Sequence, residues 1–246
     1  MYIVSEPVGL SEVHRQQLEA ENTGLYPQTY LQFLQQYGEG TYRGWMNVQL
    51  PDPEVLRPFA GYGLWEHDDD SPITEQQIGE CTAIGTTVDG DFLAVYPGVD
   101  GLLWLPRHAE QIQVIPLPPG GQEEGSYALI LDGIYRKMYG REQEESAYYE
   151  PWTGTRQHFF LRMPPRQGRV NLTELAAMCR DEFPPDLFIE NPYICCLFYR
   201  ELGGYIRLNL ANGQEVAVFF EQAAGQVSAR MKEWLLSKGC ELYPED

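Results

Sequence analysis

Short apolar runs separated by tight-turn signals occupy the middle of this chain, and they restrict its possible folds more than any other feature. Between residues 82 and 117 the runs TAIGTT, FLAVYP, LLWLP and QIQVIPL are separated by VDGD and GVDG. Asp-Gly pairs favour the positive φ angles of two-residue hairpin turns, so the runs on either side of them pair as antiparallel strands. We therefore predict a twisted antiparallel sheet in this region.

Helices are predicted before and after this sheet in the sequence. Ser11 is a favourable N-cap for a short polar helix, and Pro27 opens a second helix that ends at Tyr37. Apolar side chains recur at i, i+3, i+4 and i+7 in the second helix, which is typical of a face that packs on a core. A short strand over 45–50 and a third helix over 127–140, capped by Ser126, complete the pattern. The segment indicates an α+β domain.

A charged segment without periodicity, residues 142–150, separates this part from the rest, and it is the best linker candidate. We expect one domain over 1–142 and a smaller one over 148–246. The second has the order strand, helix, three strands, helix (βαβββα), with a capping box from Asn171 to Glu174 at the start of its first helix. About 100 residues are enough for an independent core.

Negative charge dominates the composition. The chain has 17 Lys and Arg against 36 Asp and Glu, a net charge of −19. Residues 1–140 hold 20 acidic and 6 basic residues, so −14 of that charge lies in the first part. Such a field repels nucleic acid and anionic membranes and speeds encounter with basic partners. Solubility alone would also explain it.

Targeting and cysteine patterns indicate a cytoplasmic protein. The N-terminal residues MYIVSEPVGLSE have neither a basic region nor an apolar core of the signal-peptide kind, and no apolar run is long enough to span a membrane. The five cysteines contain no CxxC pair and no His at ligand spacing, so we expect buried structural thiols.

The order of these features resembles the SUKH superfamily of bacterial immunity proteins and fungal regulators of cell-wall synthesis. The resemblance covers roughly residues 1–140, and the segment 38–56 is also similar to the GAD-like domain of immunity proteins. The residues that carry the SUKH resemblance are Leu25, Pro27, Tyr30, Phe33, Leu34, Gly38, Gly40, Trp45, Ile84, Gly85, Gly90 and Asp91. It implies a sheet of six strands or fewer packed by helices, with no catalytic constellation, that binds other proteins. In bacteria the implied partner is a toxin domain, including toxins that act on nucleic acid.

An acidic run offers the first candidate site. Glu66, Asp68, Asp69 and Asp70 could form a metal site, a solvated loop or a partner-binding patch, but they lack the glycine and terminal Glu of a calcium loop. Trp65 precedes them, and the acids around it predict an exposed aromatic anchor.

Two further acids and two further tryptophans complete the site prediction. Asp89 and Asp91 lie in a hairpin turn, where we expect them near the same contact surface. Trp45 and Trp104 stand in apolar strands, so core positions are expected for both.

Catalytic signatures are missing from the sequence. The histidines His14, His67, His108 and His158 stand in no triad, nucleophile elbow or zinc motif, so we predict no catalytic residue, metal or cofactor. The favoured function is a non-catalytic immunity-type protein that neutralises a basic toxin by binding it. A regulatory scaffold in cell-envelope synthesis or signalling is the alternative, and a hydrolase is the remote one.

Overall fold

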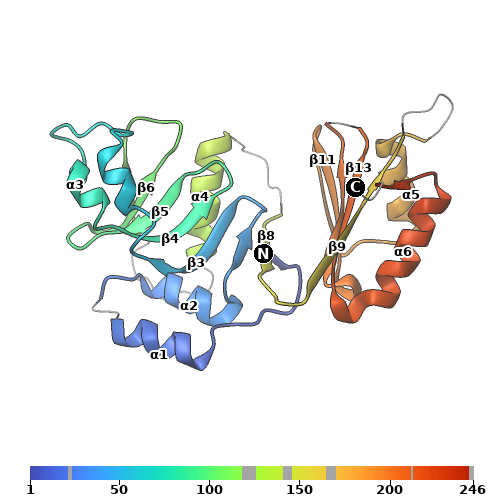
Figure 1. The fold of residues 1–246 in the computed structure, drawn as a ribbon, viewed down its shortest axis with the longest axis horizontal. Coiled ribbons are helices and arrows are strands. Elements are labelled where there is room, and N and C mark those ends of the chain that lie inside the picture. Colours follow the sequence, from blue (N-terminus) through green and yellow to red (C-terminus); the bar gives the residue numbers. More distant parts are fainter. Residues whose placement is uncertain (22–23, 118–125, 141–145, 165–169, 212, 244–246) are drawn as a thin grey trace. The chain divides into compact units, whose positions relative to one another are not determined.

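The computed structural model describes residues 1–21, 24–117, 126–140, 146–164, 170–211 and 213–243 (Figure 1). Within them the chain is mixed α and β, with six α-helices and two sheets of eight and six strands. It forms two compact units, one of Met1 and Pro7–Trp152 and one of Tyr2–Glu6 and Thr153–Asp246. In the described part of the chain, no helix has both the length and the apolar character needed to cross a membrane.

The N-terminal unit combines a sheet with four α-helices and a 3-10 turn. Seven of the eight strands of the first sheet lie in this unit, in the order β8-β2-β3-β4-β5-β6-β7, and these neighbours pair antiparallel. The helices are α1 (Glu12–Glu21), α2 (Gln28–Tyr37), α3 (Glu75–Ile78) and α4 (Ser126–Tyr139), with the 3-10 helix η1 (Arg57–Gly61). The strands are β2 (Gly40–Tyr42), β3 (Met46–Asp52), β4 (Thr82–Thr87), β5 (Phe92–Val95), β6 (Leu102–Leu105), β7 (Gln113–Ile115) and β8 (Tyr148–Pro151).

The predicted hairpin meander is confirmed. Each of the four apolar runs forms one strand, β4 to β7, and each pairs with the next. Gly90 and Gly101 have φ angles of 89° and 139°, which L side chains rarely adopt, so glycine suits both turns. The core-facing stripe of α2 is also confirmed, because Tyr30, Phe33 and Leu34 are buried.

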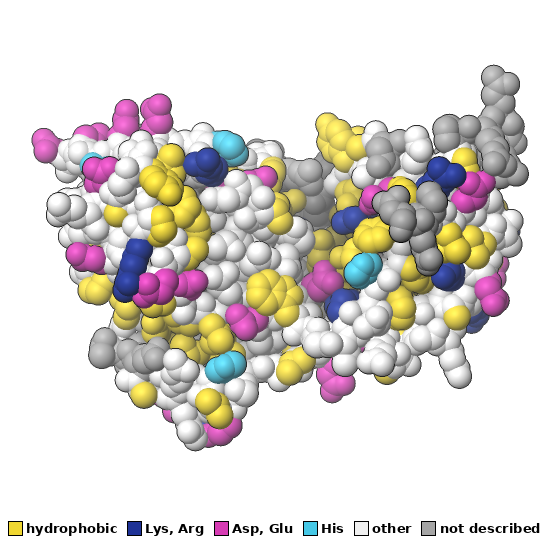
Figure 2. Space-filling model, viewed as in Figure 1, with side chains coloured by type: hydrophobic (Ala, Val, Ile, Leu, Met, Phe, Trp, Pro, Cys, Tyr) yellow, Lys and Arg dark blue, Asp and Glu magenta, His cyan; other side chains and the backbone are white. Residues whose placement is uncertain are grey.

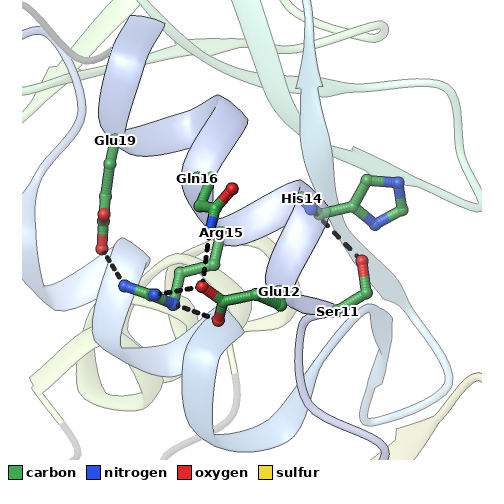
Figure 3. A network of polar contacts seen from close by, with 6 residues as sticks. All are labelled: Ser11, Glu12, His14, Arg15, Gln16 and Glu19. Carbon is green, nitrogen blue, oxygen red and sulfur yellow. Dashed lines mark hydrogen bonds and ion pairs between the residues drawn. The ribbon is translucent and has the colours of Figure 1, made fainter.

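Helix α1 is a polar surface helix, as its sequence predicts. The Ser11 hydroxyl accepts a hydrogen bond from the backbone N–H of His14 at 3.2 Å (Figure 3). Arg15 pairs with Glu12 and Glu19, both at 2.6 Å, one turn away on either side (Figure 3). Its first turn is thus closed by local polar contacts, and Leu18 is buried.

The sheet is larger than the SUKH resemblance implies. Three of its eight strands were not predicted: the edge strand β1 (Tyr2–Ile3), β2, and β8 within the expected linker. β8 pairs with β2, with Gly40 opposite Pro151 and Tyr42 opposite Tyr149. The structure therefore makes the second half of that linker part of the first sheet, and residues 141–145 lie outside the described residues. The division between the units falls after Trp152.

The C-terminal unit has a six-stranded sheet in the order β10-β11-β12-β13-β9-β14. Helices α5 and α6 cover one of its faces (Figure 1). The elements are β9 (Arg156–Arg162), α5 (Leu172–Glu182), β10 (Leu187–Glu190), β11 (Ile194–Tyr199), η2 (Arg200–Leu202), β12 (Gly204–Asn209), β13 (Glu215–Glu221), η3 (Gln222–Ala224), α6 (Gly225–Ser237) and β14 (Glu241–Leu242). The predicted βαβββα order is present, together with the capping box of Asn171 and Glu174 and two additional strands, β10 and β14.

Residues Tyr2–Glu6 belong to the C-terminal unit. The strand β1 (Tyr2–Ile3) begins a segment whose Tyr2 ring lies 5.7 Å from the ring of Phe198. The Arg200 guanidinium lies 5.9 Å from the centre of the Tyr2 ring, and Arg156 Nη2 donates to Ser5 Oγ at 3.4 Å. The second unit is therefore discontinuous in sequence, which the predicted boundaries did not include.

Candidate functional site

The predicted acidic site lies on a loop between η1 and α3, and Trp65 forms its base. Trp65 is only 5% exposed, so the prediction of an exposed anchor is wrong. Its indole Nε1 donates to the carbonyl oxygen of Pro106 at 2.8 Å, and its ring packs with that of Phe59 at 6.4 Å. Because its indole N–H donates to a carbonyl oxygen inside the core, Trp65 anchors the start of the loop to the core.

The four acids that follow are exposed and stay available as a surface patch. Backbone contacts shape their loop: Glu66 N donates to Glu110 O at 2.7 Å, and Asp70 N donates to Asp68 Oδ1 at 3.1 Å. Ser71 N also donates to Asp68 O at 3.1 Å, which closes a turn. Figure 2 shows acidic side chains gathered on the N-terminal unit in the region of α3. We call Glu66, Asp68, Asp69 and Asp70 the acidic loop.

His67 points into the unit while its neighbours point outward. Its Nδ1 lies 2.8 Å from the carbonyl oxygen of Ile73, and the Ser71 hydroxyl donates to the same oxygen at 2.9 Å. An N–H on Nδ1 donates to this carbonyl oxygen. His67 therefore fixes the end of the acidic loop next to Thr74, whose side chain caps α3.

The two predicted turn acids have different surroundings. Asp91 is 1% exposed; its Oδ2 accepts from Thr87 Oγ1 at 2.6 Å and its Oδ1 accepts from Arg107 N at 2.7 Å. It is a structural residue of the β4–β5 turn, so its side chain does not lie at the surface where we expected it. Partner binding near this turn stays a prediction. Asp89 is exposed, and its Oδ2 accepts from the Tyr139 hydroxyl at 2.7 Å. Only Asp89 of this pair presents its carboxylate at the surface.

A segment that the sequence did not single out connects the acidic loop to the turn. Pro106 O accepts from Trp65, and the next residue, Arg107, donates its backbone N–H to Asp91. Both anchors thus converge on the end of β6. Backbone groups have no residue-type signature, so no sequence signal could have indicated this role.

The ion pairs of the described residues in the N-terminal unit do not include the acidic loop. In the described part of this unit, the Arg side chains that form ion pairs bind acids elsewhere. These pairs are Arg15 with Glu12 and Glu19, Arg57 with Glu54, and Arg43 and Arg136 with Asp132. None of the described ion pairs includes an acid of the loop, so its negative charge remains directed at solvent.

The described residues contain no group of three or more His, Cys, Asp or Glu side chains that could hold a metal ion. All five cysteines are free and buried, as predicted. Burial raises the pKa of Cys81 to about 12 and that of Cys179 to about 11, so neither thiol is a ready nucleophile. Trp45 and Trp104 are buried core residues, as expected.

Comparison of the chain with protein-family models, with curated proteins and with solved structures finds no match. The resemblance to the SUKH superfamily therefore stays a prediction that rests on the residues of the N-terminal part. What the structure shows of that part is a mixed α and β unit that displays an anchored acidic loop.

Proposed function

We propose that this chain is a non-catalytic protein-binding module that holds a basic partner against the acidic loop of its N-terminal unit. The observation that carries the proposal is the state of the four loop carboxylates, which are exposed and take part in no described ion pair. The loop is also held at its base by Trp65 and His67. A binding loop that is already ordered loses less conformational entropy on association.

The proposed partner is a basic toxin domain, which the chain would neutralise as an immunity-type protein in the cytoplasm. The net charge of −14 in residues 1–140 favours basic partners, and the resemblance to SUKH proteins favours this class of function. Toxins that act on nucleic acid present basic clefts, so an acidic surface can both steer towards such a cleft and block it.

A recovery experiment tests this function. The full chain is used to capture proteins from a lysate of the cells that naturally make it. The loop variant Asp68→Asn/Asp69→Asn/Asp70→Asn is tested in parallel. A matched control removes three exposed acids from the C-terminal unit, Asp181→Asn/Glu182→Gln/Glu233→Gln. We expect a basic protein that the parent chain and the control capture at low salt and the loop variant does not. Equal capture by the loop variant would refute the role of the loop.

A further inference from the structure

The face of the C-terminal sheet that α5 and α6 leave uncovered carries a row of aromatic rings. Strand pairing places His158 opposite Phe219, Phe219 opposite Tyr205, and Tyr205 opposite Phe198, across β9, β13, β12 and β11. Alternation along the strands separates them from the neighbours that form the core with the helices, such as Leu161. The ring centres are 6.1, 4.8 and 5.2 Å apart in that order. We call these four residues the aromatic row.

One end of the aromatic row already contacts a further aromatic ring, that of Tyr2 near the N-terminus. The Tyr2 ring lies 5.7 Å from the ring of Phe198. On Tyr2 itself, the Arg200 guanidinium lies 5.9 Å from the centre of the Tyr2 ring. Phe198 is fully buried. This contact shows that the row accepts an aromatic side chain, that of Tyr2 in the extended strand β1.

The other end of the row is open to solvent. His158 is exposed, Phe160 beside it is 38% exposed, and Phe219 is half-buried. The Phe160 ring lies 5.2 Å from His158 and 6.3 Å from Phe219, so it extends the row along β9. Exposed aromatic rings in contact with one another offer a surface for a further ring, because tilted and edge-on pairs are favourable.

Charges on this face are already compensated. Three Arg–Glu pairs connect neighbouring strands: Arg207 with Glu215 at 3.1 Å, Arg162 with Glu241 at 3.2 Å and Arg156 with Glu221 at 3.4 Å. Single-stranded nucleic acid needs an excess of positive charge along its backbone as well as stacking rings. The paired arginines do not provide that excess, so the face favours a peptide over a nucleic acid.

We propose that His158, Phe219 and Tyr205 of the aromatic row, together with the neighbouring Phe160, bind an extended peptide segment of a partner protein through an aromatic side chain. The bound ring continues the stack that Tyr2 begins at Phe198. This site lies in the C-terminal unit and is independent of the acidic loop, so one can fail while the other holds.

Nuclear magnetic resonance of the isotope-labelled full chain tests the proposal. The probes are a peptide with the sequence of residues 1–7, MYIVSEP, the same peptide with Ala in place of Tyr, and a short oligothymidylate. We expect the Tyr peptide to shift resonances in β9, β12 and β13, and the Ala peptide to bind about 3- to 10-fold more weakly, in line with the loss of one aromatic pair.

Variants at the surface of the row identify the site. Phe160→Ala and His158→Ala should each weaken Tyr-peptide binding about 3-fold or more. Phe188→Ala is the matched control, since Phe188 is 52% exposed in the same sheet but points to the helix-covered face; it should leave binding unchanged. The proposal would be overturned if the Ala peptide bound as tightly as the Tyr peptide, or if the resonance shifts lay outside these strands. It would also be overturned if both variants kept the parent affinity, or if the oligothymidylate bound more tightly than the Tyr peptide.

Discussion

Asp132 of α4 joins three side chains of the N-terminal unit through its carboxylate. Its Oδ1 accepts from Tyr42 OH at 2.9 Å and from Arg43 Nη2 at 2.6 Å, and its Oδ2 pairs with Arg136 at 2.8 Å. Arg43 adopts a φ of 53°, an uncommon conformation for a residue other than glycine. The carboxylate thus holds a strained turn after β2 against helix α4.

The first prediction concerns the charge of Asp132. Burial alone would raise its pKa, but the hydrogen bonds from Arg43 and Tyr42 and the charges of Arg43 and Arg136 outweigh burial and lower the pKa below 3.8. The ionised form therefore stabilises the folded unit above pH 3.8, and this contribution is lost as the pH falls through the lower folded-state pKa. We expect Asp132→Asn to lower the free energy of unfolding at pH 7 by about 2–3 kcal/mol.

Urea unfolding followed across pH measures this effect. The difference between the parent chain and Asp132→Asn should shrink as the pH falls below 3.8. Asp100→Asn, at an exposed position of the same unit, is the control and should change little at any pH. A difference that is constant with pH would contradict a role for the ionised carboxylate.

The second prediction separates the two acids of the β4–β5 turn. Asp91→Ala leaves the Thr87 hydroxyl and the Arg107 N–H without their acceptor inside the unit. We expect the free energy of unfolding to fall by about 2–4 kcal/mol. Asp89→Ala removes a surface hydrogen bond to Tyr139 and should lower it by less than about 1 kcal/mol. Equal losses in thermal or urea unfolding would show that Asp91 is not the structural residue we describe.

At the scale of elements, the backbones of β2 and β8 approach each other closely at Gly40. A Cβ on Gly40 would lie 2.6 Å from Tyr149 Cζ and would also meet the Glu150 carbonyl oxygen. We predict that Gly40→Ala separates these strands and lowers the free energy of unfolding by about 2–4 kcal/mol. Hydrogen exchange should then increase at the backbone amides of Tyr148, Tyr149 and Glu150 in β8.

Gly61→Ala is the matched substitution, because nothing lies within 4 Å of the position that a Cβ would take there. It should leave both stability and exchange near the parent values. If the two alanine variants behaved alike, 148–151 would not be a strand of the first sheet as described.

Local signals explain which elements the sequence could predict. The Asp-Gly turns, the Asn171 capping box and the stripe of α2 depend on residues close together in the chain, and each is present in the structure. β8 pairs with a strand more than 100 residues earlier, and Tyr149 OH donates to Gly38 O at 2.7 Å. No local pattern encodes such a pairing.

Burial within the candidate site also depends on distant residues. Trp65 and Asp91 were predicted to face a partner because acids and turn residues surround them in sequence. Both instead bond to backbone groups at the end of β6. The exposure of Glu66, Asp68, Asp69 and Asp70 follows from their own polarity, so sequence alone was sufficient there.

At the scale of the whole molecule, the reactivity of the buried thiols measures how well each unit protects its core. Burial raises the pKa of Cys81 in the N-terminal unit and of Cys195 and Cys240 in the C-terminal unit, each to about 12. We predict that alkylation at pH 8 is at least about 100-fold slower in the native chain than in urea, because the thiols are protonated and covered.

Mass spectrometry of the alkylated peptides checks this prediction. Replacing Tyr2 by Ala should speed labelling of Cys195 and Cys240 but not of Cys81, because Tyr2–Glu6 belongs to the C-terminal unit. Equal acceleration at all three thiols would contradict this assignment of the N-terminal segment.

The distribution of charge connects the structure to the proposed function. The N-terminal part carries most of the net charge of −19, and its described ion pairs leave the acidic loop uncompensated. The C-terminal sheet instead pairs Arg162 and Arg207 with glutamates and presents aromatic rings. The two units thus offer surfaces of different chemistry.

The most direct test of the acidic loop is calorimetric titration of the recovered basic partner into three forms of the full chain. These are the parent, Asp68→Asn/Asp69→Asn/Asp70→Asn, and the control Asp181→Asn/Glu182→Gln/Glu233→Gln. Each is measured at about 0.01 M and about 1 M ionic strength, where the screening length falls from about 30 Å to about 3 Å. We predict that the loop variant loses at least about 10-fold in affinity at low salt and most of the salt dependence, while the control retains both. A loop variant that binds as tightly as the parent, with the same salt dependence, would contradict the account.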